Sequence, residues 1–72
     1  MKEPVVEVDE DAHGILVSYG EEIKRFESVQ EAVNFAREKY IEYLGIFGTA
    51  ALCVKRKFYY DDKWDIAFNE SS

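Results

Sequence analysis

The stretch SVQEAVNFAREKYIEYLG, residues 28–45, decides the fold because it carries the clearest helix pattern in the chain. Apolar residues recur in it every three or four positions, which is typical of one buried side of a helix. These residues are Val29, Ala32, Val33, Ala36, Tyr40 and Leu44. Ser28 is predicted to cap the helix, with Glu31 completing a capping box. Gly45 is predicted to end it, since glycine adopts the left-handed conformation without a Cβ penalty.

Two aromatic residues of this helix, Phe35 and Tyr43, fall outside that apolar side and are eight positions apart. Residues at this spacing return to nearly the same side of a helix. They either widen the buried side or form a second contact strip, and the first arrangement is the commoner one.

The residues before the helix predict three strands joined by tight turns. Apolar residues alternate or cluster in residues 4–8, 15–19 and 22–26, and the third of these strands is short and polar. Glycine-containing turns at residues 11–14 and 20–21 separate them. The pattern therefore predicts two consecutive antiparallel hairpins.

The residues after the helix predict two more strands. Residues 46–48 are too apolar for a free loop and are expected to lie under the edge of the sheet. Residues 49–60 are predicted as one long strand, followed by a turn at 61–63 and a last strand at 64–68. Residues 69–72 are expected to fray. The residues expected on one face of the last strand are Trp64, Ile66 and Phe68.

These elements predict one small α+β domain over residues 1–72: a two-layer fold with a mainly antiparallel sheet (β-β-β-α-β-β) and one amphipathic helix on one face. A single helix covers only one face of such a sheet. The other face is predicted to carry some combination of Val5, Leu16, Cys53 and Tyr59, according to the register. Because large apolar patches are rarely left bare, we expect this face to meet a partner, of which a second copy is the simplest.

The charge of the chain favours protein partners over nucleic acid. The net charge is −6, and residues 1–44 hold eleven acidic and five basic residues, whereas residues 45–72 are balanced. An acidic surface repels phosphate backbones, so duplex DNA is a poor partner and a basic protein is a better one.

The cysteine content and hydropathy indicate the compartment. Cys53 is the only cysteine, so no internal disulfide can form, and its apolar neighbours predict a buried thiol in a reducing environment. No segment resembles a signal peptide or a membrane span. A cytoplasmic location is therefore expected.

The sequence offers no strong site for a metal, a cofactor or a reaction. Asp9, Asp11, His13 and Gly14 match part of a calcium loop, but Gly20 stands where the loop needs a bidentate glutamate. His13, the only histidine, has no activated nucleophile near it in the sequence. We therefore expect a non-enzymatic protein without metal or cofactor.

The stretch KRKFYY, residues 55–60, mixes bases and aromatics in a way that is typical of strands that stack on single-stranded nucleic acid. Strand alternation divides this stretch, however, and puts Lys55, Lys57 and Tyr59 on one face. Phe58 and Trp64 are expected to pack in the core instead.

The sequence as a whole predicts a small acidic, non-catalytic protein-interaction module of the adaptor, inhibitor or modulator type, which self-associates through a sheet face or edge. The alternative is a single-stranded nucleic-acid-binding protein that uses residues 55–60. The residues predicted to contact the partner are Lys55, Lys57, Tyr59, Leu16 and Val5.

Overall fold

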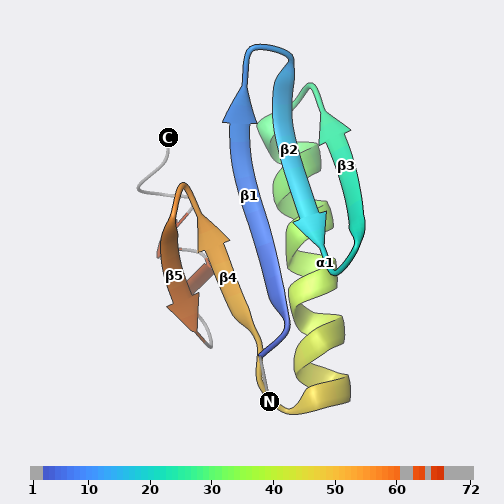
Figure 1. The fold of residues 1–72 in the computed structure, drawn as a ribbon, viewed down its shortest axis with the longest axis vertical. Coiled ribbons are helices and arrows are strands. Elements are labelled where there is room, and N and C mark those ends of the chain that lie inside the picture. Colours follow the sequence, from blue (N-terminus) through green and yellow to red (C-terminus); the bar gives the residue numbers. More distant parts are fainter. Residues whose placement is uncertain (1–2, 61–62, 65, 68–72) are drawn as a thin grey trace.

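A five-stranded sheet and one long helix make up the fold, which is α+β as predicted (Figure 1). The computed structural model describes residues 3–60, 63–64 and 66–67. The elements are β1 (Val5–Asp11), β2 (Gly14–Tyr19), β3 (Glu22–Phe26), α1 (Val29–Phe47), β4 (Ala51–Val54) and β5 (Lys57–Tyr60). The strands lie side by side in the order β3-β2-β1-β4-β5.

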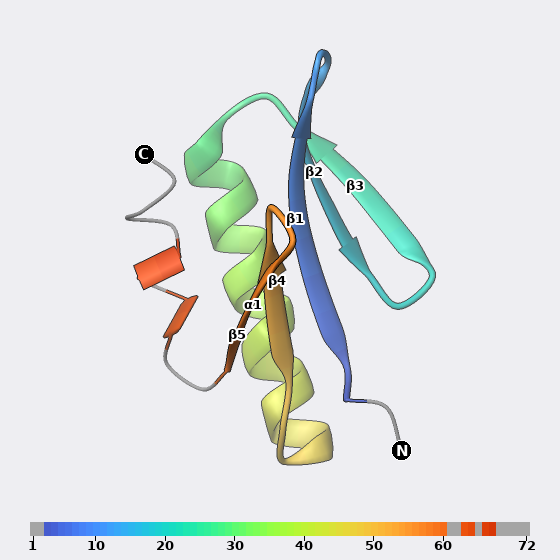
Figure 2. The same cartoon turned by 60° about the vertical axis from the view of Figure 1, so that its left-hand side comes forward.

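The first three strands form the two predicted antiparallel hairpins, whose turns lie at opposite ends of the sheet (Figure 2). β3 has the predicted bounds, and β2 begins one residue earlier than predicted. β1 continues three residues beyond the predicted end at Val8, to Asp11. Its acidic end is held in the sheet because Asp9, Glu10 and Asp11 pair with β2.

The sheet is mixed, because β4 runs parallel to β1 while the other three pairs of strands are antiparallel. The antiparallel pattern predicted from the sequence is therefore wrong at this pair. The reason is the length of α1, whose 19 residues span about 28 Å at the usual rise per residue. The helix carries the chain back along the sheet, so that β4 starts level with β1 and points the same way (Figure 1).

The helix begins where the sequence predicts and ends one turn later. Ser28 has the extended conformation of an N-cap, but its side chain makes no capping hydrogen bond, so the predicted capping box is absent. Gly45 lies inside the helix, and Gly48 (φ +76°) ends it by donating its N–H to the Leu44 carbonyl oxygen (2.9 Å). Residues 46–48 therefore form the last turn, and Phe47 is 58% exposed rather than tucked under the sheet.

The predicted strand over residues 49–60 is in fact a hairpin. β4 and β5 form an antiparallel pair in which Val54 lies opposite Lys57, so that Lys55 and Arg56 between them form a two-residue turn. Both turn residues have positive φ (49° and 72°), as a type I′ hairpin turn requires. Such turns are usually marked by Asn or Gly, so no local signal in this stretch indicates the break.

The predicted last strand is helical in its described residues. Trp64, Ile66 and Ala67 have helical backbone, and Phe68 lies outside the described residues, as do residues 61–62 of the predicted turn and the tail 69–72. Trp64 and Ala67 pack against the core, whereas Ile66 is 46% exposed. Trp64 and Ala67 are three positions apart and both contact the core, a spacing that fits a helix and not a strand.

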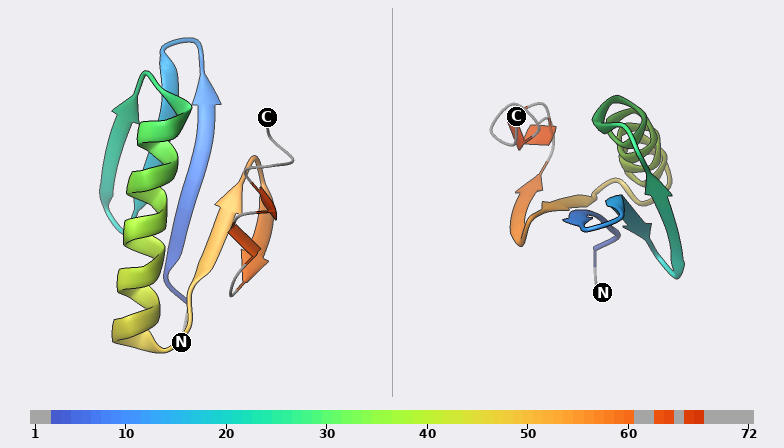
Figure 3. Two further views of the ribbon diagram at one scale, coloured as in Figure 1. Left: turned by 180° about the vertical axis from the view of Figure 1, so that it is seen from behind. Right: turned by 90° about the horizontal axis from the view of Figure 1, so that it is seen from above.

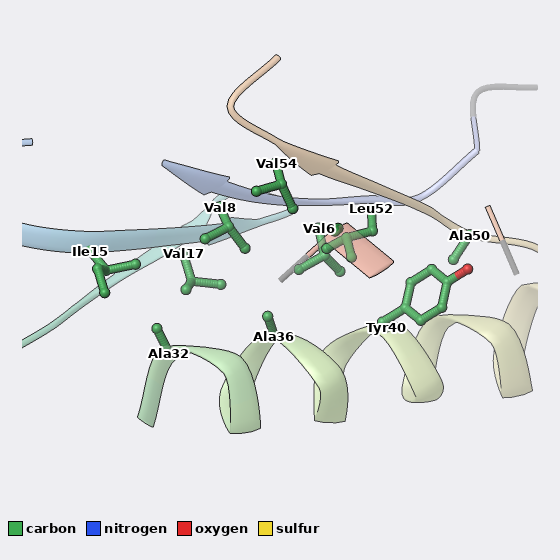
Figure 4. Packing of buried hydrophobic residues seen from close by; sticks show 11 residues of the cluster. Val6, Val8, Ile15, Val17, Ala32, Ala36, Tyr40, Ala50, Leu52 and Val54 are labelled. Atoms are coloured by element: carbon green, nitrogen blue, oxygen red, sulfur yellow. The ribbon is translucent and has the colours of Figure 1, made fainter. Parts of the chain in front are cut away.

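The core lies between the sheet and two helical segments on one side of it (Figures 3 and 4). α1 packs against β1, β2 and β3, and the segment with Trp64 and Ala67 lies on the same side next to β4 and β5. The Arg37 guanidinium lies over the Trp64 ring, 4.5 Å from its centroid, and so links the two segments. The residues buried in the core are Val6, Val8, Ile15, Val17, Ala32, Ala36, Tyr40, Ala50, Leu52, Val54 and Ala67.

The predicted apolar side of the helix is largely confirmed. Its central residues are buried, whereas Val29 at its start is 60% exposed. Phe35 and Tyr43 pack against the core, so they widen the buried side. Phe35 contacts the rings of Tyr19 and Phe26 at centroid distances of 5.1 and 5.2 Å.

Candidate interaction surface

The face of the sheet that points away from α1 is the candidate functional site, and we refer to it as the open face. No helix or strand of the described residues lies against it (Figure 3). Strand alternation and the register place twelve side chains on it. They are Val5, Glu7, Asp9, Asp11, Leu16, Ser18, Ile23, Arg25, Ala51, Cys53, Phe58 and Tyr60.

Large apolar side chains are exposed at both borders of the open face. Ile23 on β3 is 64% exposed, and on β5 Phe58 and Tyr60 are 56% and 47% exposed. Val5 and Leu16 are half-buried between these borders. Exposed apolar groups on one face of a sheet favour contact with another surface.

A row of carboxylates divides the open face along the central strand. Glu7, Asp9 and Asp11 alternate along β1 and are all exposed. Asp11 forms an ion pair with Arg25 and also accepts from the backbone N–H of His13 (2.8 Å). These contacts, the Arg25 hydrogen bond above all, lower the pKa of Asp11. Glu7 and Asp9 form no ion pair with any described residue.

Cys53 lies on β4 in the middle of the open face, level with Glu7 on one side and Phe58 on the other. It is buried, as the sequence predicts. Burial raises the pKa of its thiol, and the nearby Glu7 carboxylate adds to the effect. Because the thiolate is the reactive form, this cysteine is not an activated nucleophile.

The five residues predicted to contact a partner do not share one surface. Val5 and Leu16 lie on the open face. Tyr59 lies on the opposite face and packs against the core, and the register places Lys57 on that side as well. Lys55 is in the β4–β5 turn. The structure therefore brings together only Val5 and Leu16 from this set.

Sequence reasoning missed the most exposed members of the open face. Phe58 was expected in the core, but it faces outward, because the turn at residues 55–56 sets the alternation of β5. Ile23 is part of a strand that reads as polar, which obscured it. For Glu7 and Asp9 a signal existed, since they alternate with buried Val6 and Val8.

The described residues contain no group of three or more histidine, cysteine or acidic side chains arranged to hold a metal ion. None of their helices is both long and apolar enough to cross a membrane. The chain matches no protein-family model, no curated protein and no solved structure at a significant level.

Proposed function

We propose that this chain is a small acidic, non-catalytic protein-interaction module that self-associates through the open face of its sheet. The observation that carries the proposal is the exposure of Ile23, Phe58 and Tyr60 on a face that no described element covers. Burying the exposed part of each of these side chains would contribute about 1 kcal/mol to association.

A second copy is the proposed partner because the open face and its border carry both signs of charge. Glu7 and Asp9 are exposed on β1, and Lys55 and Arg56 are exposed at the turn beside the face. A surface that carries both signs can complement itself in a symmetric dimer. The buried thiol of Cys53 suits a reducing compartment, and we place the dimer in the cytoplasm on that ground.

Sedimentation velocity over a range of protein concentrations tests the proposal. We expect Phe58→Ser to weaken self-association about tenfold, because it removes exposed apolar surface from the open face. Phe47→Ser is the matched control, since Phe47 is equally exposed but lies at the end of α1. A wild-type chain that stays monomeric, or an equal effect of the two substitutions, would contradict the proposal.

A second candidate function is binding of single-stranded nucleic acid at residues 55–60. It is favoured by the exposed bases Lys55 and Arg56 next to the exposed rings of Phe58 and Tyr60. The acidic row on β1 opposes it, since it repels phosphates. The test is titration with an oligonucleotide at low salt: binding that Lys55→Glu with Arg56→Glu abolishes would support it, and no binding would exclude it.

A further inference from the structure

Charges of opposite sign lie on either side of β4. β1, on one side, carries the exposed carboxylates of Glu7 and Asp9, neither of which forms an ion pair with a described residue. β5, on the other side, begins after the turn formed by Lys55 and Arg56, both exposed. β4 is thus the midline between an acidic row and a basic turn.

The basic turn and the far end of the acidic row lie at the same level along the strands. The Lys55 N–H donates to the Val8 carbonyl oxygen (3.1 Å), so the turn is beside the Asp9 end of β1. Further along, Val5 is level with Ala51 and Tyr60. A two-fold axis parallel to the strands leaves the position of each residue along the strands unchanged, so residues that are level within one copy are also level between the two copies.

We propose that two copies pack with their open faces together, about a two-fold axis along β4, so that Asp9 in the acidic row of each copy contacts the basic turn of the other. This inference rests on the proposed self-association and names its register. In it, β1 of each copy lies opposite β5 of its partner. Asp9 then meets the partner turn, Glu7 lies level with the partner's Phe58, and Val5 meets the ring of the partner's Tyr60.

The side chains on the midline suit such an axis. β4 presents Ala51 and Cys53 to the open face, and these small side chains are already buried (2% and 5% exposed). Small side chains at the axis let the two sheets approach to the usual spacing of about 10 Å. An axis along β1 would instead place the acidic row against itself, which like-charge repulsion disfavours.

The backbone of the basic turn is a second observation at the same place. Lys55 and Arg56 both adopt positive φ, a conformation that costs non-glycine residues free energy and that Asn-Gly supplies at lower cost. Strained backbone is concentrated at functional sites. Basic residues at these two unfavourable backbone positions are consistent with a turn whose positive charge takes part in binding.

The expected contact is small. In this register only β1, β4 and β5 of each copy lie opposite strands of the partner. Three strands at their usual spacing of about 4.8 Å, each about five residues long, offer a planar area of about 10 by 17 Å. This is below the roughly 800 Å² of accessible surface that each partner buries in a standard interface. We therefore expect a reversible dimer that forms at micromolar concentrations and weakens with salt.

A charge-swap experiment tests the register. We expect Asp9→Lys and Arg56→Glu each to weaken dimerisation about tenfold, because each change places like charges together at two symmetric contacts. The double variant should recover to within about threefold of the wild type. Glu38→Lys, an exposed change on α1, is the control for net charge. It should not weaken dimerisation, because it lowers the repulsion between two copies that each carry a net charge of −6. Circular dichroism of every variant verifies folding.

The outcomes separate this register from the proposed function. Recovery in the double variant supports the register. A wild-type dimer without recovery overturns the register and leaves self-association standing. Edge pairing through β3 would then be indicated by a dimer that Arg25→Pro disrupts and Arg25→Ala does not. A wild-type chain that stays monomeric at several hundred micromolar overturns both.

Discussion

Gly14 lies so close to the backbone of β3 that a larger residue at this position would clash with it. Its φ is +133°, and a Cβ placed there would lie 2.5 Å from the carbonyl oxygen of Phe26. The β1–β2 hairpin and the β2–β3 pair can both form only because this residue has no side chain.

We expect Gly14→Ala to lower the free energy of unfolding by about 1–3 kcal/mol, measured by urea denaturation. Gly45→Ala is the matched control. Gly45 is helical with nothing within 4 Å of an added Cβ, so alanine there should raise stability by about 0.5–1 kcal/mol. Equal stability of Gly14→Ala and the wild type would show that the hairpin tolerates a shift of the Phe26 backbone.

Tyr19 provides a pH-dependent contact. Its hydroxyl donates to the Glu22 carboxylate, which raises the pKa of Tyr19 from 10.0 to about 12. Because the folded pKa lies above the unfolded one, the stabilisation is complete below about pH 10 and is lost as the pH rises through about 12. We expect Glu22→Gln to lower the pKa of Tyr19 towards 10, measured by NMR titration of the ring. Glu21→Gln should leave it unchanged, and a similar shift in both variants would contradict the assignment.

At the level of elements, the β4–β5 hairpin is the least expected part of the fold. Its turn contains Lys55 and Arg56 in left-handed conformations, without the Asn or Gly that such turns favour. The pairing of β4 with β1 on one side and β5 on the other keeps the turn in place.

We therefore expect Lys55→Asn with Arg56→Gly to raise the free energy of unfolding by about 1 kcal/mol, because it relieves the strain at both positions. If the turn acts in dimerisation as proposed, the same variant should bind its own copy more weakly. Thermal unfolding and sedimentation measure the two effects separately. A variant that is less stable than the wild type would contradict the assigned turn.

For the whole molecule, coverage of the core depends on two segments from distant parts of the chain. α1 covers β1, β2 and β3, and the segment with Trp64 and Ala67 packs against the rest of the core. The Arg37–Trp64 contact joins the two segments. The C-terminal helical segment is thus part of the folding unit.

We expect Trp64→Ala to lower the free energy of unfolding by about 2–3 kcal/mol, since it removes a half-buried ring from the core and from Arg37. Ile66→Ala, at an exposed neighbour in the same segment, should cost less than about 0.5 kcal/mol. Urea denaturation followed by far-ultraviolet circular dichroism measures both. Similar losses in the two variants would show that the segment does not pack as described.

Three of the four residues expected on the uncovered face lie on the open face. Val5 and Leu16 follow from alternation in strands whose limits are marked by nearby turn residues, and Cys53 lies before the unmarked turn, so its face does not depend on it. Phe58 was placed wrongly in the core, because the faces of β5 depend on where the unmarked turn falls. A shift of one residue moves every side chain of a strand to the other face.

The sequence by itself determined the α+β class, the three N-terminal strands, the start of α1 at Ser28 and most of its buried side. These features depend on apolar periodicity and turn chemistry, which act between residues a few positions apart. The tertiary structure alone decided that β4 lies parallel to β1, that the chain turns at Lys55 and Arg56, and that Trp64, Ile66 and Ala67 have helical backbone. Each of these depends on contacts between residues far apart in the chain, such as the hydrogen bond from Lys55 to Val8, which no local pattern records.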